Sequence, residues 1–285
     1  MSEETTGRAH RVLEAARRLL DDCAIERAPV DLVRLARHVG IGRIRELDIR
    51  LDGQLVERGD GDYEVILSRN APHTRRRFTL AHEIGHILVA AHENGSMSCG
   101  DGPTEELCNR VAAELLMPGR FVHAAVMADM DVSGFRRLAT QFQCSLEATG
   151  WRVLNVGKIA GALLVWRQQD DGGLELSAAP RTFGFDLPFE SGHVLEGNLP
   201  FVRQLAQRSD GPLTYEHPAS GKVYRGDYVR LNKVVLMFFK TAGSAVSNRR
   251  RRAAAAPEQG ELFGSGGDHT KRHSRGSGNP WAERG

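Results

Sequence analysis

The stretch from Arg77 to Ala90 constrains this chain more than any other, because a His-Glu-x-x-His pentad lies within an almost uninterrupted apolar sequence. On a helix, His82 and His86 are four residues apart and share one face, so their imidazole nitrogens can hold one zinc ion. Glu83 lies beside them and can reach a water on the open side of that metal. Three fixed positions recur by chance in about a few per cent of chains this long, so the pentad needs support from its surroundings.

The residues around the pentad supply that support. At about 100° per residue, one side of the helix carries Leu80, Ile84, Ile87, Leu88 and Ala91, and most of the remainder is filled by Ala81, Val89 and Ala90. A helix that is apolar nearly all round is a buried helix. Two histidines and a glutamate inside it are costly unless something satisfies them, and a metal ion does.

A second helix is predicted downstream, over residues 103–118. Thr104 can cap its start, acidic residues occupy its first turn, and Pro118 with the following glycine ends it. Its buried arc on a helical wheel consists of Leu107, Cys108, Val111, Ala112, Leu115 and Leu116. This helix is the place to look for a third metal ligand.

Three carboxylates in this second helix compete for that role. Glu105 falls at the edge of the buried arc, so it is the predicted ligand, whereas Glu106 and Glu114 form a stripe with Arg110 on the opposite side. Such a stripe is typical of a solvated ion-pair face, so Glu106 and Glu114 are predicted to be surface residues. Asn109, one turn after Glu105, is a candidate to hold one of the histidines by a hydrogen bond.

The two helices together resemble a known family. The sequence Arg-Phe-Thr-Leu-Ala-His-Glu-x-x-His followed by Glu-x-Leu-Cys-Asn-x-x-Ala-Ala-x-Leu-Leu-Met-Pro is similar to that of the ImmA/IrrE family of zinc metallopeptidases. The resemblance implies one zinc ion per chain, with His82, His86 and Glu105 as its ligands and Glu83 as the catalytic base. It is strongest over residues 75–118, and a weaker similarity to the radiation-response branch continues to about residue 240.

The family also implies a biological role and a partner. Its members typically act inside bacteria by cutting a helix-turn-helix (XRE-like) transcriptional repressor, which releases stress or mobile-element genes. In the radiation-response members, the region that corresponds to residues 158–240 is a GAF-like sensor domain. Such a domain could bind a small ligand, and the alternative is a structural module that binds nothing.

Composition and charge exclude several other classes. The formal net charge of +2 implies no bulk electrostatic partner, and no apolar run approaches the length of a membrane span. The N-terminus lacks the apolar segment of a signal peptide. Cysteines 23, 99, 108 and 144 are too few and too irregular for a disulfide framework. A cytoplasmic protein is therefore expected.

The residues before the pentad predict two helices and a small sheet. Helices are expected over 8–24 and 32–39, an extended region from Ile44, and short strands at 55–56 and 63–67. An edge strand of this sheet could bind an extended substrate by strand addition, or the sheet could simply cover the core. The adjacent arginines 75–77 could recruit an acidic or nucleic partner, or form a solvated helix entry.

Between the two metal helices, residues 92–102 contain glycines and serines typical of a mobile loop that borders the cleft. Cys99 in this loop is either a redox-sensitive ligand or a small loop residue, and Cys108 is predicted to lie in the core. His92 is predicted to end the helix and not to act as a fourth ligand, because a catalytic zinc keeps that position for water.

After residue 119, the pattern changes. Predicted helices at 134–142 and 146–156, joined by a short turn before Ser145, resemble a helix-turn-helix. The second of them carries Glu147 and Arg152 but no basic cluster, so packing is favoured over DNA reading. Strands at 162–166, 174–177 and 234–239 and a helix at 201–206 follow, and residues 241–285, with the tetra-arginine at 249–252, are expected to be a disordered basic tail.

The sequence therefore predicts an α+β fold in four parts. These are a zincin-like metallopeptidase domain over 1–119, a helix-turn-helix-like segment over 120–157, a GAF-like α/β domain over 158–240 and the tail. The predicted function is a zinc-dependent endopeptidase that hydrolyses a peptide bond in a repressor. The alternative from another class is a non-catalytic regulator that binds DNA or a repressor; the intact pentad favours the enzyme.

Overall fold

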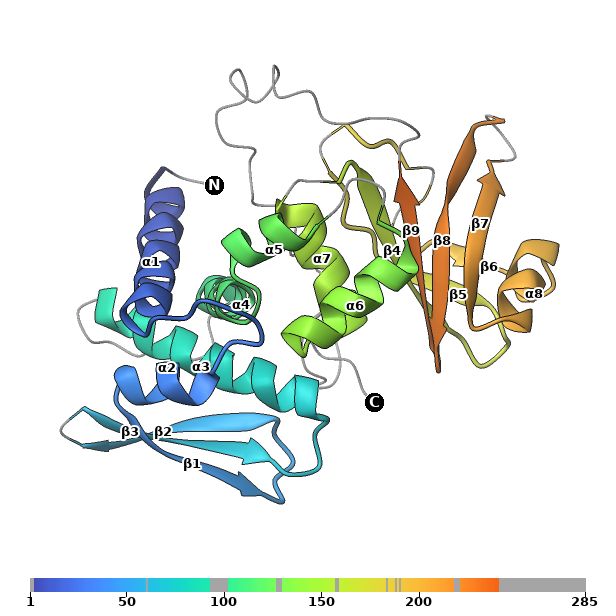
Figure 1. Cartoon of the computed structure of the whole chain (residues 1–285). Helices are drawn as coiled ribbons and strands as arrows, with labels where there is room; N and C mark the ends of the chain where they lie inside the picture. Colours follow the sequence, from blue (N-terminus) through green and yellow to red (C-terminus); the bar gives the residue numbers. More distant parts are fainter. Residues whose placement is uncertain are drawn as a thin grey trace, which may run out of the picture. The chain divides into compact units, whose positions relative to one another are not determined.

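The computed structural model describes residues 3–59, 61–92, 102–126, 130–156, 159–182, 184–187, 189, 191–217 and 221–240 (Figure 1). These residues fall into two compact units. The first consists of residues up to Ala124 together with Ala139–Ser145, and the second of Ala125–Leu138 together with the described residues from Leu146 onward. The expected loop containing Cys99 and the expected basic tail lie outside the described residues. The mixture of helices and sheets confirms the α+β class.

The first unit contains the metal helices that the sequence predicts. Its helices are α1 (Glu3–Asp22), α2 (Leu32–His38), α3 (His73–His92), α4 (Gly102–Leu116) and α5 (Gly119–Ala125). Asp31 caps α2 by accepting a hydrogen bond from the backbone N–H of Arg34 (3.1 Å). Helix α1 buries the apolar residues Val12, Ala16, Leu19 and Leu20 and packs on α3 and α4.

A three-stranded sheet completes this unit. Its strands β1 (Ile41–Leu47), β2 (Gly53–Gly59) and β3 (Asp62–Ser68) have the order β1-β3-β2, with β1 parallel and β2 antiparallel to β3. Side chains alternate between the faces, and Val65 and Leu67 are buried on the inner face, toward the helices (Figure 1). The opposite side, called the outer face below, carries Arg43, Arg45 and Glu64.

The arginines at positions 75–77 contact the protein itself. Arg75 forms an ion pair with Asp52, and Arg76 donates hydrogen bonds to two backbone carbonyls just before α3 (3.0 and 3.1 Å). Arg77 donates to the carbonyl of Val30 (3.0 Å), and burial lowers the pKa of its guanidinium. These contacts give the arginines a structural role in holding the start of α3 to the surrounding segments.

The second unit is built on a larger sheet. Its elements are α6 (Val132–Phe142), α7 (Leu146–Val156), β4 (Gly161–Gln168), β5 (Leu174–Ala178), β6 (Val194–Leu195), α8 (Pro200–Gln207), β7 (Asp210–Glu216), β8 (Val223–Leu231) and β9 (Val234–Lys240). The sheet order is β6-β5-β4-β9-β8-β7, and every neighbouring pair is antiparallel. Trp166, Met237 and Phe239 belong to a large buried cluster that also includes residues of α8.

Helix α7 occupies the position of a recognition helix in the predicted helix-turn-helix, but it is a core helix. A Cβ placed on Gly150 would come within 2.8 Å of Leu163 and 2.9 Å of Phe238, so α7 lies directly on the sheet. Trp151 is buried, as is Glu147, whose Oε2 lies 3.8 Å from a guanidinium nitrogen of Arg167. A helix packed in this way does not present a face that could enter a DNA groove.

No helix in the described part of the chain is long and apolar enough to cross a membrane. Cys23, Cys108 and Cys144 are buried. Burial raises the pKa of Cys144 to about 12, against the opposing effect of the Arg77 guanidinium. These thiols are therefore packing residues, as predicted for Cys108.

Candidate metal centre

Helix α3 is buried along most of its length, as the apolar wheel predicts. Its buried residues include every position from Phe78 to Ala90 except His82, which is largely but not fully covered. His86 is 9% exposed and Glu83 is 8% exposed. Burial lowers the pKa of His86, which keeps its imidazole neutral and able to act as a metal ligand.

The structure brings the donor atoms of the three predicted ligands together. His82 Nε2 lies 3.0 Å from His86 Nε2 and 3.2 Å from Glu105 Oε2, and His86 Nε2 lies 3.5 Å from Glu105 Oε1. Donor atoms 2.0–2.2 Å from a tetrahedral zinc are about 3.3–3.6 Å apart. The spacing and the two-histidine, one-carboxylate donor set therefore fit zinc, with a fourth position left open.

Asn109 holds the first of these histidines in place. Its Oδ1 lies 2.9 Å from His82 Nδ1, so the ring donates Nδ1–H to the amide oxygen and keeps the lone pair of Nε2 on the metal side. The contact that the helical wheel predicted for Asn109 is confirmed. The amide thereby fixes both the tautomer and the orientation of the ring.

Replacement of Asn109 by Leu is expected to lower the zinc affinity by about 10–100-fold, because His82 then loses the acceptor that orients its ring. Asn109→Asp keeps an acceptor at the same position and is the matched control, with an affinity at least equal to that of the wild type. The measurement is zinc binding in competition with a chromophoric chelator. Equal affinity in wild type and Asn109→Leu would show that packing alone orients His82.

Glu83 is the candidate base, and its surroundings suit that role. Burial raises the pKa of its carboxyl to about 7, His82 opposes this rise, and Glu105 adds to it. A carboxyl group with a pKa near neutrality can both accept and return a proton at physiological pH. The raised pKa of Glu83 could not be obtained from the pentad sequence itself, because it depends on how deeply α3 is buried.

The two metal helices cross closely at a glycine. A Cβ on Gly85 would lie 3.2 Å from the Cα and the carbonyl oxygen of Cys108, which is tighter than nine in ten ordinary contacts. Glu105 and Asn109 lie one turn before and one residue after Cys108, so this crossing brings both toward the histidines. This close approach at Gly85 was not predicted from the sequence, although a glycine inside a helix normally has a packing or functional reason.

The helical-wheel prediction for Glu114 on α4 is wrong. Glu114 was predicted to lie on the surface, but it is 5% exposed, and its Oε1 accepts a hydrogen bond from the backbone N–H of Gly119 (3.1 Å). The cause is α1, which packs on this side of α4 and places Arg17 Nε 3.6 Å from the carboxylate. Glu106, also predicted to lie on the surface, is partly buried, and this burial raises the pKa of its carboxyl. His92 ends α3 with its Nδ1 2.8 Å from the carbonyl oxygen of Leu88.

Comparison with protein families places this geometry in a known context. Residues 32–154 match the model of the family Peptidase_M78, described as the IrrE N-terminal-like domain. The match spans less than half of the chain and shows what this part of it is similar to. The match covers the three-stranded sheet, α3, α4 and most of α7, so it includes all four residues assigned above by motif and wheel.

The wider fold also has a counterpart among solved structures. The chain is similar to a structure named Mycobacterium tuberculosis transcriptional regulator, with a TM-score of 0.54 and 16% sequence identity over 81% of this chain and 87% of that one. At this identity the likeness shows the fold alone. A search among curated proteins finds no match.

Proposed function

We propose that this chain is a zinc-dependent endopeptidase that cleaves a helix-turn-helix transcriptional repressor and so derepresses the genes it controls. The observation that carries the proposal is the juxtaposition of His82, His86 and Glu105 at zinc spacing, next to a buried Glu83, within a region that matches a peptidase family. We also propose that the protein acts in the cytoplasm, with one zinc ion per chain.

The residues divide the chemistry between them. His82, His86 and Glu105 hold the zinc ion, which when bound polarises the scissile carbonyl and lowers the pKa of a coordinated water toward ~7. Glu83 accepts a proton from the attacking water as its oxygen bonds to the carbonyl carbon. The same carboxyl group then donates that proton to the amide nitrogen as the C–N bond breaks, which regenerates the base.

The four-part division of the chain belongs to the proposal as well. We propose a peptidase domain over residues 1–119, a helix-turn-helix-like segment over 120–157, a GAF-like sensor over 158–240 and a basic tail. The antiparallel sheet of the second unit, with α8 against its buried cluster, is compatible with a sensor module. A non-catalytic regulator is the second candidate, and the regulator name of the structural neighbour favours it.

The direct test uses the full chain and a purified XRE-like repressor. Elemental analysis is expected to find one zinc atom per chain, and incubation should convert the repressor into two fragments on a gel. A chelator should stop the cleavage and added zinc should restore it. Protein that carries no zinc and gains none on reconstitution would contradict the metal site, whereas zinc-loaded protein that leaves the repressor intact would contradict the substrate.

A further inference from the structure

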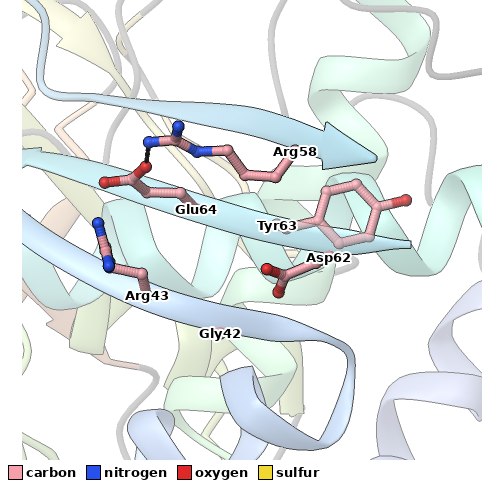
Figure 2. Close-up of a pocket in the computed structure, with 6 residues that line it drawn as sticks. All are labelled: Gly42, Arg43, Arg58, Asp62, Tyr63 and Glu64. Carbon is pink, nitrogen blue, oxygen red and sulfur yellow. Dashed lines mark ion pairs between the residues drawn. The ribbon is translucent and has the colours of Figure 1, made fainter. Parts of the chain in front are cut away.

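A pocket lies on the outer face of the three-stranded sheet. It has a volume of about 330 Å³ and is lined by Gly42, Arg43, Arg58, Asp62, Tyr63 and Glu64 (Figure 2). Helix α3 packs on the opposite, inner face, where Val65 is fully buried. The sheet therefore separates the pocket from the metal-binding residues, and neither the motif nor the proposed reaction uses it.

A buried carboxylate forms one wall of this pocket. Glu64 is only 1% exposed although it lies on the outer face, and it forms an ion pair with Arg58 (Figure 2). Arg45 Nη1 lies 3.5 Å from the other carboxylate oxygen. Beyond these two ion pairs, neither oxygen of Glu64 has a hydrogen-bond partner within the described residues. A buried charge of this kind holds its partners firmly, because leaving it unpaired is costly.

Two further charged groups line the pocket without such a partner. Both residues pair with neighbouring strands through their backbones, but among the described residues the side chains of Arg43 and Asp62 form no hydrogen bond or ion pair. Asp62 lies over Gly42, where a Cβ would approach its Oδ1 to 2.6 Å, so the glycine makes room for the carboxylate. The pocket thus contains a guanidinium group in Arg43 that is free to bind a ligand.

The balance of charge favours an anionic ligand. Arg43 and Arg58 line the pocket with two positive charges, against two negative charges on Asp62 and Glu64, and Arg45, which pairs with Glu64 from outside the lining, adds a third positive charge. Because Glu64 is engaged by Arg45 and Arg58, it fixes Arg58 at the pocket while leaving other guanidinium N–H donors available. Arginine presents these donors in a planar fork that matches the oxygens of carboxylates and phosphates.

We propose that this pocket binds a small ligand through a carboxylate or phosphate group, which Arg43 and Arg58 hold from two strands. A volume of about 330 Å³ lies at the lower end of the range of small-molecule sites. The site acts independently of the zinc chemistry, and its ligand stabilises the sheet by joining β1 to β2 across β3.

The first experiment titrates inorganic phosphate into the isotope-labelled full chain at low ionic strength, with the backbone amide of Gly42 as the reporter. Arg43→Gln is expected to weaken binding about tenfold, because one charge-assisted contact is lost. Arg45→Gln is the matched control, since it lies on the same strand and face and contacts Glu64 but does not line the pocket. Equal weakening by both variants, or no shift of Gly42 with phosphate, would overturn the proposal.

Asp62→Asn tests whether the ligand of the pocket is negatively charged. Removing the like charge should strengthen phosphate binding by about two- to fivefold at low salt. A ligand that used Asp62 as an acceptor would instead bind more weakly to this variant, and that result would overturn the anionic assignment. A titration with succinate tests the carboxylate form of the ligand and should show the same dependence on Arg43, and a succinate titration that is unaffected by Arg43→Gln would overturn the proposal.

Discussion

Glu83→Gln is expected to lower the rate of repressor cleavage by roughly 10²–10⁴-fold while leaving the fold and the zinc content unchanged. Glutamine keeps the size and shape of glutamate, so it fills the same buried position on α3, but it cannot accept a proton at neutral pH. Because Glu83 is not among the proposed ligands, the three donor atoms remain in place. Binding of the repressor should also persist, since the surface around the site is unaltered.

This substitution separates the enzyme from the binding-only regulator. The measurement is cleavage of the repressor on a gel together with expression of a gene under its control, for wild type and variant. A non-catalytic regulator predicts that Glu83→Gln is silent in cells. Full derepression by a folded, zinc-loaded but inactive variant would therefore favour that alternative over the peptidase.

Glu105→Ala is expected to lose the metal, with a fall in zinc affinity of at least about 100-fold. It removes one of three donor groups, whereas changes outside the ligand set typically cost about 10–100-fold. The carboxylate of Glu105 is the donor from α4 that lies within 3.5 Å of both histidines. Cleavage should disappear with the metal, and added zinc at ordinary concentrations should not restore it.

Glu106→Ala is the matched control for this change, because it removes the same charge from the adjacent, partly exposed position of the same helix. Its zinc content should equal that of the wild type in elemental analysis. Glu114 is unsuitable as a control, since its buried carboxylate supports the backbone of Gly119. If Glu106→Ala released zinc and Glu105→Ala kept it, the assignment of the α4 ligand would be wrong.

Helices α3 and α4 could be predicted from sequence because apolar residues recur along them at helical spacing around the motif residues. The apolar wheel predicted a buried α3, and Pro118 marked the end of α4 closely. The predicted cap Thr104 lies inside α4, where its hydroxyl accepts a hydrogen bond from Arg8. Residue spacing on these two helices was also enough to place Glu105 and Asn109 toward the histidines, since each helix is rigid and regular. The error at Glu114 has a different origin. A helical wheel orders the faces of one helix but does not reveal that α1 covers a second face of α4.

The second unit was harder to predict from sequence. The strands β4, β5 and β9 were expected, whereas β6, β7 and β8 were missed. Strand β8 contains a Gly-Asp pair that reads as a turn, yet Gly226 lies opposite Phe239, where a Cβ would meet the neighbouring backbone at 1.8 Å. Pairing with β9, which is distant from the Gly-Asp pair in local sequence terms, therefore keeps β8 extended through Gly226.

The crossing at Gly85 has a consequence for engineering the site. The pentad leaves two positions open, but one of them sets the distance between the two ligand-bearing helices. An alanine at position 85 would require Cys108, and with it the backbone of α4, to shift by a few tenths of an ångström. The separation of the helices is thus set by the smallest residue in the motif, which is itself neither a predicted ligand nor the predicted base.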